Sequence, residues 1–194
     1  MPPKAKITRD MVIDAAFEIA RTVGAEEISA RTVAEKLGSS TQPVMYHFAT
    51  IAELKRATYA KADAFHTEYI TRFETENCNI MNKIGRQYIR FAKEEKNLFR
   101  FLFQSDFVVG DGIAGIIDTE EAAPIVELMS RATGLNTQKT KKIFLLIAMF
   151  AHGYASMLAN NSLEYDENVI MAHLELAYKG AFMAVMEENY EEIV

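Results

Sequence analysis

Cysteine is almost missing from this chain of 194 residues, which contains Cys78 and no other. A single thiol excludes an intrachain disulfide and any zinc site built on several thiolates. Tryptophan is absent, and proline occurs only four times, twice at positions 2 and 3. No segment sustains the two-residue alternation of β-branched side chains that is typical of strands. These absences favour an all-α fold.

Long hydrophobic runs are also missing. The most apolar run, residues 143–151, is far shorter than the roughly 20 residues that a helix needs to span a bilayer. Residues 1–6 contain no apolar stretch of the signal-peptide type. We therefore expect a cytoplasmic protein with no membrane partner.

Positive charge is scarce, since the formal net charge is −6. That balance is unfavourable for contact with the phosphates of nucleic acid. The charge is unevenly distributed, however. Residues 1–60 hold eight basic and seven acidic side chains, a balance of +1, so the rest of the chain carries −7. The N-terminal part can therefore approach a phosphate backbone, whereas the rest is repelled by it.

What the chain does have is helical periodicity with clear start and stop signals. Apolar residues recur at three- and four-residue spacing, Thr8 and Ser29 stand at N-cap positions, and Gly24 and Gly38 follow helix ends. The spacing predicts about nine helices, near residues 9–23, 30–37, 41–47, 51–73, 79–93, 98–104, 118–131, 137–160 and 166–188.

The segment from Ser29 to Phe48 carries the strongest functional signal. Two short helices meet at Gly38-Ser39-Ser40, where the glycine can adopt the backbone angles of a tight turn and Ser40 or Ser39 can cap the next helix. This is the pattern of a helix-turn-helix, whose second helix enters the major groove of DNA by its N-terminal end. We therefore predict a DNA-binding domain over residues 1–50 and a helical body over residues 51–194.

The second helix of this motif begins with polar residues that suit contact with bases. Gln42 can form two hydrogen bonds with an adenine edge, and Thr41 can offer its hydroxyl or its methyl group. Tyr46 and His47, nearer the helix end, can reach phosphate oxygens. The residues predicted to bind double-stranded DNA are Arg31, Thr32, Ser40, Thr41, Gln42, Tyr46, His47 and Lys55. Such a protein would be associated with the nucleoid.

A wider pattern of small and apolar residues surrounds the motif over about residues 8–55. It comprises Val12, Ala15, Ala16, Ile19, Gly24, Ser29, Val33, Ala34, Leu37, Gly38, Ser40, Tyr46, His47, Phe48 and Leu54. With this spacing the chain resembles the TetR family of one-component bacterial regulators. The resemblance implies a three-helix DNA-binding head, a divergent ligand-binding body and a homodimer built on the last two long helices. We expect a repressor that a small-molecule effector releases from its operator.

Two positions depart from the family pattern. The family usually has tyrosine where this chain has Met45, with Tyr46 following, and lysine where Ile51 stands. Lys55 can substitute in part. These departures leave open which side chains anchor the phosphates.

The predicted helix 137–160 is apolar on nearly every face in its middle, so it needs cover on all sides. We expect a second copy of the chain to cover one face, because Gly153, Ala155 and Ser156 allow another helix to approach closely. The last helix offers an apolar stripe made of Leu174, Ala177, Ala181, Phe182 and Val185. A two-fold homodimer through helices 137–160 and 166–188 would favour a palindromic operator.

Aromatic and methionine side chains of the body can form core or line an effector pocket. The candidate lining residues are Tyr88, Phe91, Phe103, Phe107, Met129, Phe150 and His152. The sequence does not separate the two roles.

Two other functions are open: a helical small-molecule enzyme, and a dimerisation module without DNA binding. An enzyme would need a pairing of histidine with carboxylate around His152 or His173, and no catalytic or metal-ligand grouping is visible along the sequence. We therefore expect no catalysis, metal or cofactor. Residues 110–115 match G-x-G-x-x-G, but no good strand precedes them, so we interpret them as a connector.

Overall fold

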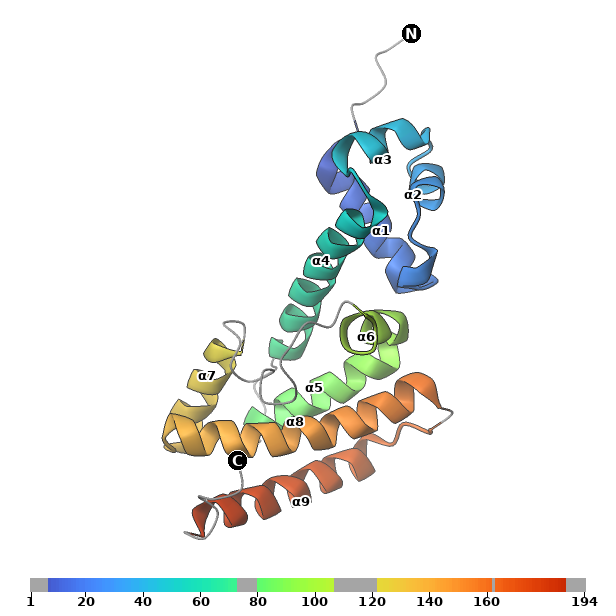
Figure 1. Ribbon diagram of the computed structural model, residues 1–194. Coiled ribbons are helices and arrows are strands. Elements are labelled where there is room, and N and C mark those ends of the chain that lie inside the picture. The colour runs from blue at the N-terminus through green and yellow to red at the C-terminus, as the bar shows by residue number, and fades with distance from the viewer. Residues whose placement is uncertain (1–6, 73–79, 107–121, 162, 188–194) are drawn as a thin grey trace. The chain divides into compact units, whose positions relative to one another are not determined.

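The computed structural model describes residues 7–72, 80–106, 122–161 and 163–187 (Figure 1). Within these ranges every regular element is helical, which confirms the all-α prediction. The elements are α1 Arg9–Thr22, a 3-10 turn η1 Ala25–Glu27, α2 Ala30–Lys36, α3 Thr41–His47, α4 Ile51–Thr71, α5 Ile80–Glu94, α6 Lys96–Phe103, α7 Ala123–Thr133, α8 Thr137–Asn160 and α9 Glu167–Met186.

The predicted helix starts follow from side-chain caps. The Thr8 hydroxyl accepts a hydrogen bond from the Met11 amide at 3.2 Å and begins α1. Ser29 accepts from the Thr32 amide at 3.1 Å, and the Thr32 hydroxyl accepts from the Ser29 amide at 3.0 Å, so α2 begins with a reciprocal capping box. The start predicted for the seventh helix, near residue 118, lies outside the described residues.

The chain divides into two compact units. Unit 1 comprises residues 1–68 and 95–108, and unit 2 comprises residues 69–94 and 109–194. Most of α4 and all of α6 therefore belong with the first three helices. The functional boundary predicted near residue 50 stays a prediction, because contact grouping does not test which residues bind DNA.

Unit 1 is built on the apolar inner faces of its helices. Val12 on α1, Val33 on α2 and Val44 on α3 are completely buried, as is Leu54 on α4. Polar contacts hold α6 to the end of α1. The Arg21 guanidinium donates two hydrogen bonds to the Glu95 carboxylate, and the Asn97 amide donates to the Arg21 carbonyl at 3.1 Å.

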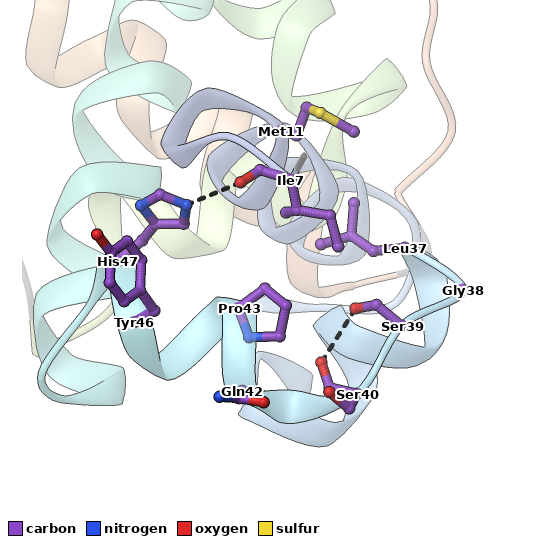
Figure 2. Close-up of a pocket in the computed structure, with 10 residues that line it drawn as sticks. All are labelled: Ile7, Met11, Leu37, Gly38, Ser39, Ser40, Gln42, Pro43, Tyr46 and His47. Atoms are coloured by element: carbon purple, nitrogen blue, oxygen red, sulfur yellow. Dashed lines mark hydrogen bonds between the residues drawn. The ribbon is translucent and has the colours of Figure 1, made fainter. Parts of the chain in front are cut away.

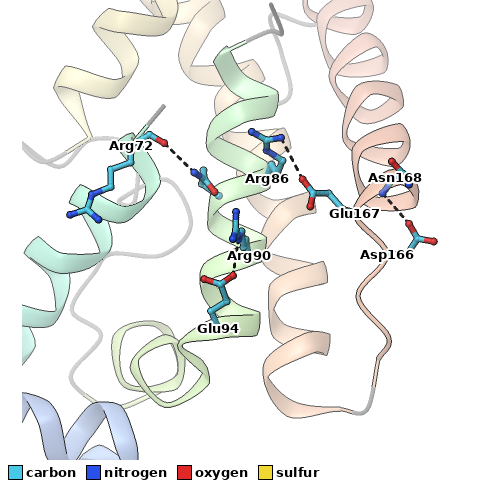
Figure 3. A network of polar contacts seen from close by, with 8 residues as sticks. Arg72, Arg86, Arg90, Glu94, Asp166, Glu167 and Asn168 are labelled. Carbon is cyan, nitrogen blue, oxygen red and sulfur yellow. Dashed lines mark hydrogen bonds and ion pairs between the residues drawn. The ribbon is translucent and has the colours of Figure 1, made fainter. Parts of the chain in front are cut away.

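Unit 2 packs α5, α7, α8 and α9 around one apolar core, in which α8 and α9 lie side by side (Figure 1). Ile143 and Ile147 of α8 are buried there with Leu174 of α9. Figure 3 shows polar contacts on α5 and at the start of α9. Asp166 caps α9 through the Asn168 amide at 3.0 Å, and ion pairs join Arg86 to Glu167 at 3.4 Å and Arg90 to Glu94 at 2.7 Å.

The apolar stripe predicted on α9 packs into this core, since Leu174, Ala181 and Val185 are buried. Other large apolar side chains of α8 and α9 remain exposed, namely Leu146, Met157, Val169, Leu176, Met183 and Met186. By length and composition both helices could cross a membrane, although core helices of soluble proteins pass the same test. Only 33% of the most apolar window of α8 and 22% of that of α9 are buried, so both helices leave apolar surface uncovered.

Candidate DNA-binding site

The turn between α2 and α3 has the backbone that the sequence predicts. Gly38 has a φ of +59°, in the left-handed region, and no atom lies within 4 Å of the place where a Cβ would stand. A side chain would therefore meet no steric obstacle there, but the backbone angle itself disfavours any L residue. The Ser39 amide donates to the Ala34 carbonyl at 2.9 Å and closes the end of α2.

A serine stands at the N-cap of α3 as predicted, but it does not form the expected capping hydrogen bond. Ser40 is the N-cap residue with extended backbone angles, yet its side chain makes no capping hydrogen bond. The neighbouring Ser39 hydroxyl donates instead to the Ser40 carbonyl at 3.0 Å. The exposed Ser40 hydroxyl is therefore available to an outside partner.

Helix α3 has one buried side and one solvent-facing side. Val44 is fully buried, α3 contacts α1 and α2, and Phe48 is the buried C-cap residue of α3. Thr41 and Gln42 are exposed, and Tyr46 is 79% exposed. The two residues predicted to meet bases are thus held on a rigid element with their side chains accessible.

The remaining predicted contacts differ in how accessible they are. Arg31 on α2 is exposed, and Lys55 on α4 is half-buried. The Thr32 hydroxyl already accepts from the Ser29 amide in the α2 cap and donates to the Glu27 carbonyl at 2.7 Å, so its first role is structural.

Amide groups at the start of α4 donate hydrogen bonds to side chains of the same segment. The Thr50 hydroxyl accepts from the Glu53 amide at 3.1 Å, and the Glu53 carboxylate accepts from the Ala49 amide at 3.1 Å. A capping box therefore begins α4, with its second bond shifted by one residue. An anionic carboxylate at this helix start competes with any phosphate for the same end of the helix dipole.

A groove of about 630 Å³ lies between the entry to α1 and the exposed side of α3 (Figure 2). It is lined by Ile7, Met11, Leu37, Gly38, Ser39, Ser40, Gln42, Pro43, Tyr46 and His47. On its border the His47 Nε2 lies 2.9 Å from the Ile7 carbonyl oxygen. Ile7 and Met11 were not predicted here, because at least 30 positions of sequence separate them from α3 and no spacing rule connects them.

Among the candidate pocket residues, Tyr88 of α5 and His152 of α8 come together. The Tyr88 hydroxyl lies 2.9 Å from the His152 Nδ1. Burial raises the pKa of Tyr88 and lowers the pKa of His152, so both groups are neutral at physiological pH. Met129 belongs to the same apolar core, and Phe150 packs against it.

The other candidate pocket residues have different surroundings, where the structure describes them. Phe91 is fully buried in unit 2, with its ring 5.3 Å from that of Tyr69. Phe103 is in unit 1, where its ring lies 5.0 Å from that of His66. Phe107, like Cys78 and the glycines of residues 110–115, lies outside the described residues.

The histidines that an enzyme would need are bonded to tyrosines. His152 contacts Tyr88, and the His173 Nδ1 is hydrogen-bonded to the Tyr154 hydroxyl. In the described part of the chain, no three histidine, cysteine or acidic side chains form a group that could hold a metal ion.

Comparison with known proteins identifies the fold. No protein-family model matches the sequence, and no curated protein matches it. Solved structures do match. A TetR-family member from Streptomyces coelicolor is 18% identical with a TM-score of 0.61, over 87% of this chain and 96% of that one. A TetR-like transcriptional regulator from Rhodococcus is 14% identical with a TM-score of 0.58, over 93% and 97% of the two chains.

A third matching structure contains a bound small molecule. It is the multidrug binding protein EbrR complexed with ethidium, which is 15% identical with a TM-score of 0.54, over 91% of this chain and 99% of that one. The chain therefore has the fold of TetR-family regulators along nearly its whole length. At such low identity the likeness concerns the fold, and function has to be argued from the site.

Proposed function

We propose that this chain is a sequence-specific DNA-binding transcriptional regulator of the repressor type, which a small-molecule effector releases from its operator. The observation that carries the proposal is the rigid α2–turn–α3 motif, in which Val44 is buried while Thr41 and Gln42 face solvent. The positive balance of residues 1–60 supports the same interpretation.

The accessible groups divide by chemistry. Thr41 and Gln42 stand at the N-terminal end of α3, the end that enters the major groove in this motif, and would meet base edges. Tyr46 and Arg31 are exposed on the flanking surface and would bind phosphates with Lys55. Ser40 can add a hydroxyl contact beside them.

The test is selection of a binding sequence from random DNA at low salt, followed by titration of the selected site. Gln42→Ala should lose about 1–3 kcal/mol of discrimination at one base position. Gln138→Ala on α8 is the matched control, because Gln138 is also an exposed glutamine and lies outside the motif. Failure of the wild-type chain to bind any sequence would refute the proposal, and equal loss on all sequences would make Gln42 a phosphate contact.

We propose further that the chain acts as a homodimer through α8 and α9. Their exposed apolar side chains include Leu176, which is 70% exposed, and Met183, which is 62% exposed. Monomeric proteins rarely leave large continuous apolar patches in water. A Cβ on Gly153 or Gly180 would meet no atom within 4 Å, so a partner helix could approach there. Two-fold symmetry would present two copies of α3 to a palindromic operator.

The effector is proposed to be a small, mostly apolar molecule held in unit 2. Tyr88 and His152 supply a neutral hydrogen-bonding pair beside an apolar core, which is the composition of small-molecule sites. Ethidium, held by one protein of this fold, is a suitable probe in the absence of DNA. We expect a saturable fluorescence change that Tyr88→Phe weakens. Native mass spectrometry of the purified chain would identify a bound molecule directly, and that molecule should then lower operator affinity.

A further inference from the structure

The solvent-facing side of α3 consists of two rows of side chains. Thr41 and Met45, four positions apart, form one row, and Gln42 and Tyr46 form the other. All four residues are exposed, Met45 to 42%. Gln42 and Tyr46 also line the groove beside α1 (Figure 2). Because Val44 is buried on the opposite side, a partner that approaches α3 from solvent meets these two rows.

Neither row carries a formal charge. Residues 41–47 include no lysine or arginine. The one histidine of the helix, His47, already has its Nε2 2.9 Å from the Ile7 carbonyl oxygen. In the major groove, guanine is most often recognised by arginine or lysine, which donate to its O6 and N7 atoms. The side chains of α3 are therefore better suited to bases other than guanine.

The two rows match the two halves of an A·T pair. In the major groove adenine presents an N7 acceptor and an N6 donor, and thymine presents its O4 atom and its C5-methyl group. The Gln42 amide both donates and accepts, so it can bond N6 and N7 together. The Thr41 methyl group and the Met45 side chain are apolar and suit contact with the thymine methyl group.

Met45 can reach the bases although it lies one turn behind Thr41. Its Cα is about 6 Å further along the helix axis. The Cα–Cβ bonds of a helix tilt toward its N-terminus, which is the end that enters the groove in this motif. Methionine is unbranched and has three rotatable bonds, so its side chain can extend forward along the helix. At 42% exposure, that side chain is not enclosed in the core of unit 1.

We infer that α3 recognises A·T pairs, and that Met45 is a specificity-determining residue that contacts a thymine C5-methyl group while Gln42 hydrogen-bonds an adenine. The inference rests on the proposed function and adds the class of base pair that the helix recognises. Since the family usually has tyrosine where Met45 stands, the methionine contact is a property of this chain.

Removal of single thymine methyl groups tests the inference. The wild-type chain first selects its operator from random DNA, and each thymine of one half-site is then replaced in turn by deoxyuridine. Deoxyuridine lacks only the C5-methyl group and keeps the O4 acceptor. At one position or more the wild-type affinity should fall about four-fold, the factor that corresponds to one buried CH₂ group. Unchanged affinity at every thymine would overturn the inference.

A double-mutant cycle assigns the methyl contact to Met45. At the sensitive position, Met45→Ala should show no loss of affinity on replacement of thymine by deoxyuridine. Met45→Leu keeps an apolar side chain and should retain most of the loss. Leu128→Ala on α7 is the matched control, because Leu128 is apolar and also 42% exposed, and it should show the full four-fold loss. If Met45→Ala were as sensitive as the wild type, the inference would be overturned.

The selected sequence supplies a second measurement. The base position at which Gln42→Ala loses discrimination should hold an A·T pair. A G·C pair there, or no such position, overturns the inference. A chain that binds no DNA would overturn the proposed function and the inference with it. A chain that binds its operator but is indifferent to the thymine methyl groups would overturn the inference alone.

Discussion

His66 is a histidine of α4 that the fold of unit 1 encloses. It is 7% exposed, and its ring lies 5.0 Å from that of Phe103 on α6. Burial lowers the pKa of His66 from 6.5 to about 4, because a charged imidazolium loses its hydration there. Mild acid should therefore destabilise the folded protein, because the unfolded chain takes up a proton on His66 that the folded chain excludes.

The sign and size of the effect follow from proton binding. Between pH 4 and 6.5 the unfolded chain protonates this histidine and the folded chain does not, so the unfolded state binds more protons. The free energy of unfolding then rises with pH: stability is fully present above pH 6.5 and is lost as the pH falls toward 4. For His66 alone, acidification from pH 7 to pH 5 should cost about 2 kcal/mol.

Urea unfolding followed by circular dichroism at pH 7 and pH 5 measures this loss. His66→Leu should be about 2 kcal/mol less sensitive to the acidification than the wild type. His152 has a lowered pKa and adds to the wild-type sensitivity, but it remains in both chains and cancels in the difference. Gln138→Leu, which removes an exposed side chain that does not titrate, should keep the wild-type sensitivity. Equal acid sensitivity in His66→Leu and wild type would refute the reasoning.

Four further substitutions test the turn, the ion pairs and the proposed dimer. Gly38→Ala should cost about 1 kcal/mol and lower the melting temperature, because its φ of +59° disfavours a side chain although space is free; an unchanged melting temperature would contradict this. Arg21→Ala removes the ion-pair partner of the Glu95 carboxylate, which is only 11% exposed. The free energy of unfolding in urea should fall by about 1–3 kcal/mol. Arg131→Ala breaks an ion pair with Glu127 whose two side chains are mostly exposed, and it should cost at most about 0.5 kcal/mol; a cost equal to that of Arg21→Ala would argue against the difference in burial. Leu176→Glu should shift the sedimentation of a dimer toward monomer, whereas Gln138→Glu, the same charge at an already polar exposed site, should not; an unshifted Leu176→Glu would place the interface elsewhere.

The local features of this protein were predictable from sequence because short-range chemistry determines them. Thr8 and Ser29 cap helices as predicted, since a cap needs only a side chain and an amide three residues away. Gly38 adopts the left-handed conformation that its place between two helices indicates. The exposure of Thr41 and Gln42 follows from the same helical periodicity that buries Val44.

Contacts between distant segments were decided by tertiary structure alone. The bond from His47 to the Ile7 carbonyl spans forty residues, and the pairing of Tyr88 with His152 spans sixty-four. No periodicity encodes such pairs, because they depend on how helices pack and not on the spacing within any one helix. Helix α9 carries apolar residues on most of its sides. Periodicity alone therefore could not separate the residues that pack inside one chain from those that stay exposed. Packing places Leu174 in the core and leaves Leu176 in solvent.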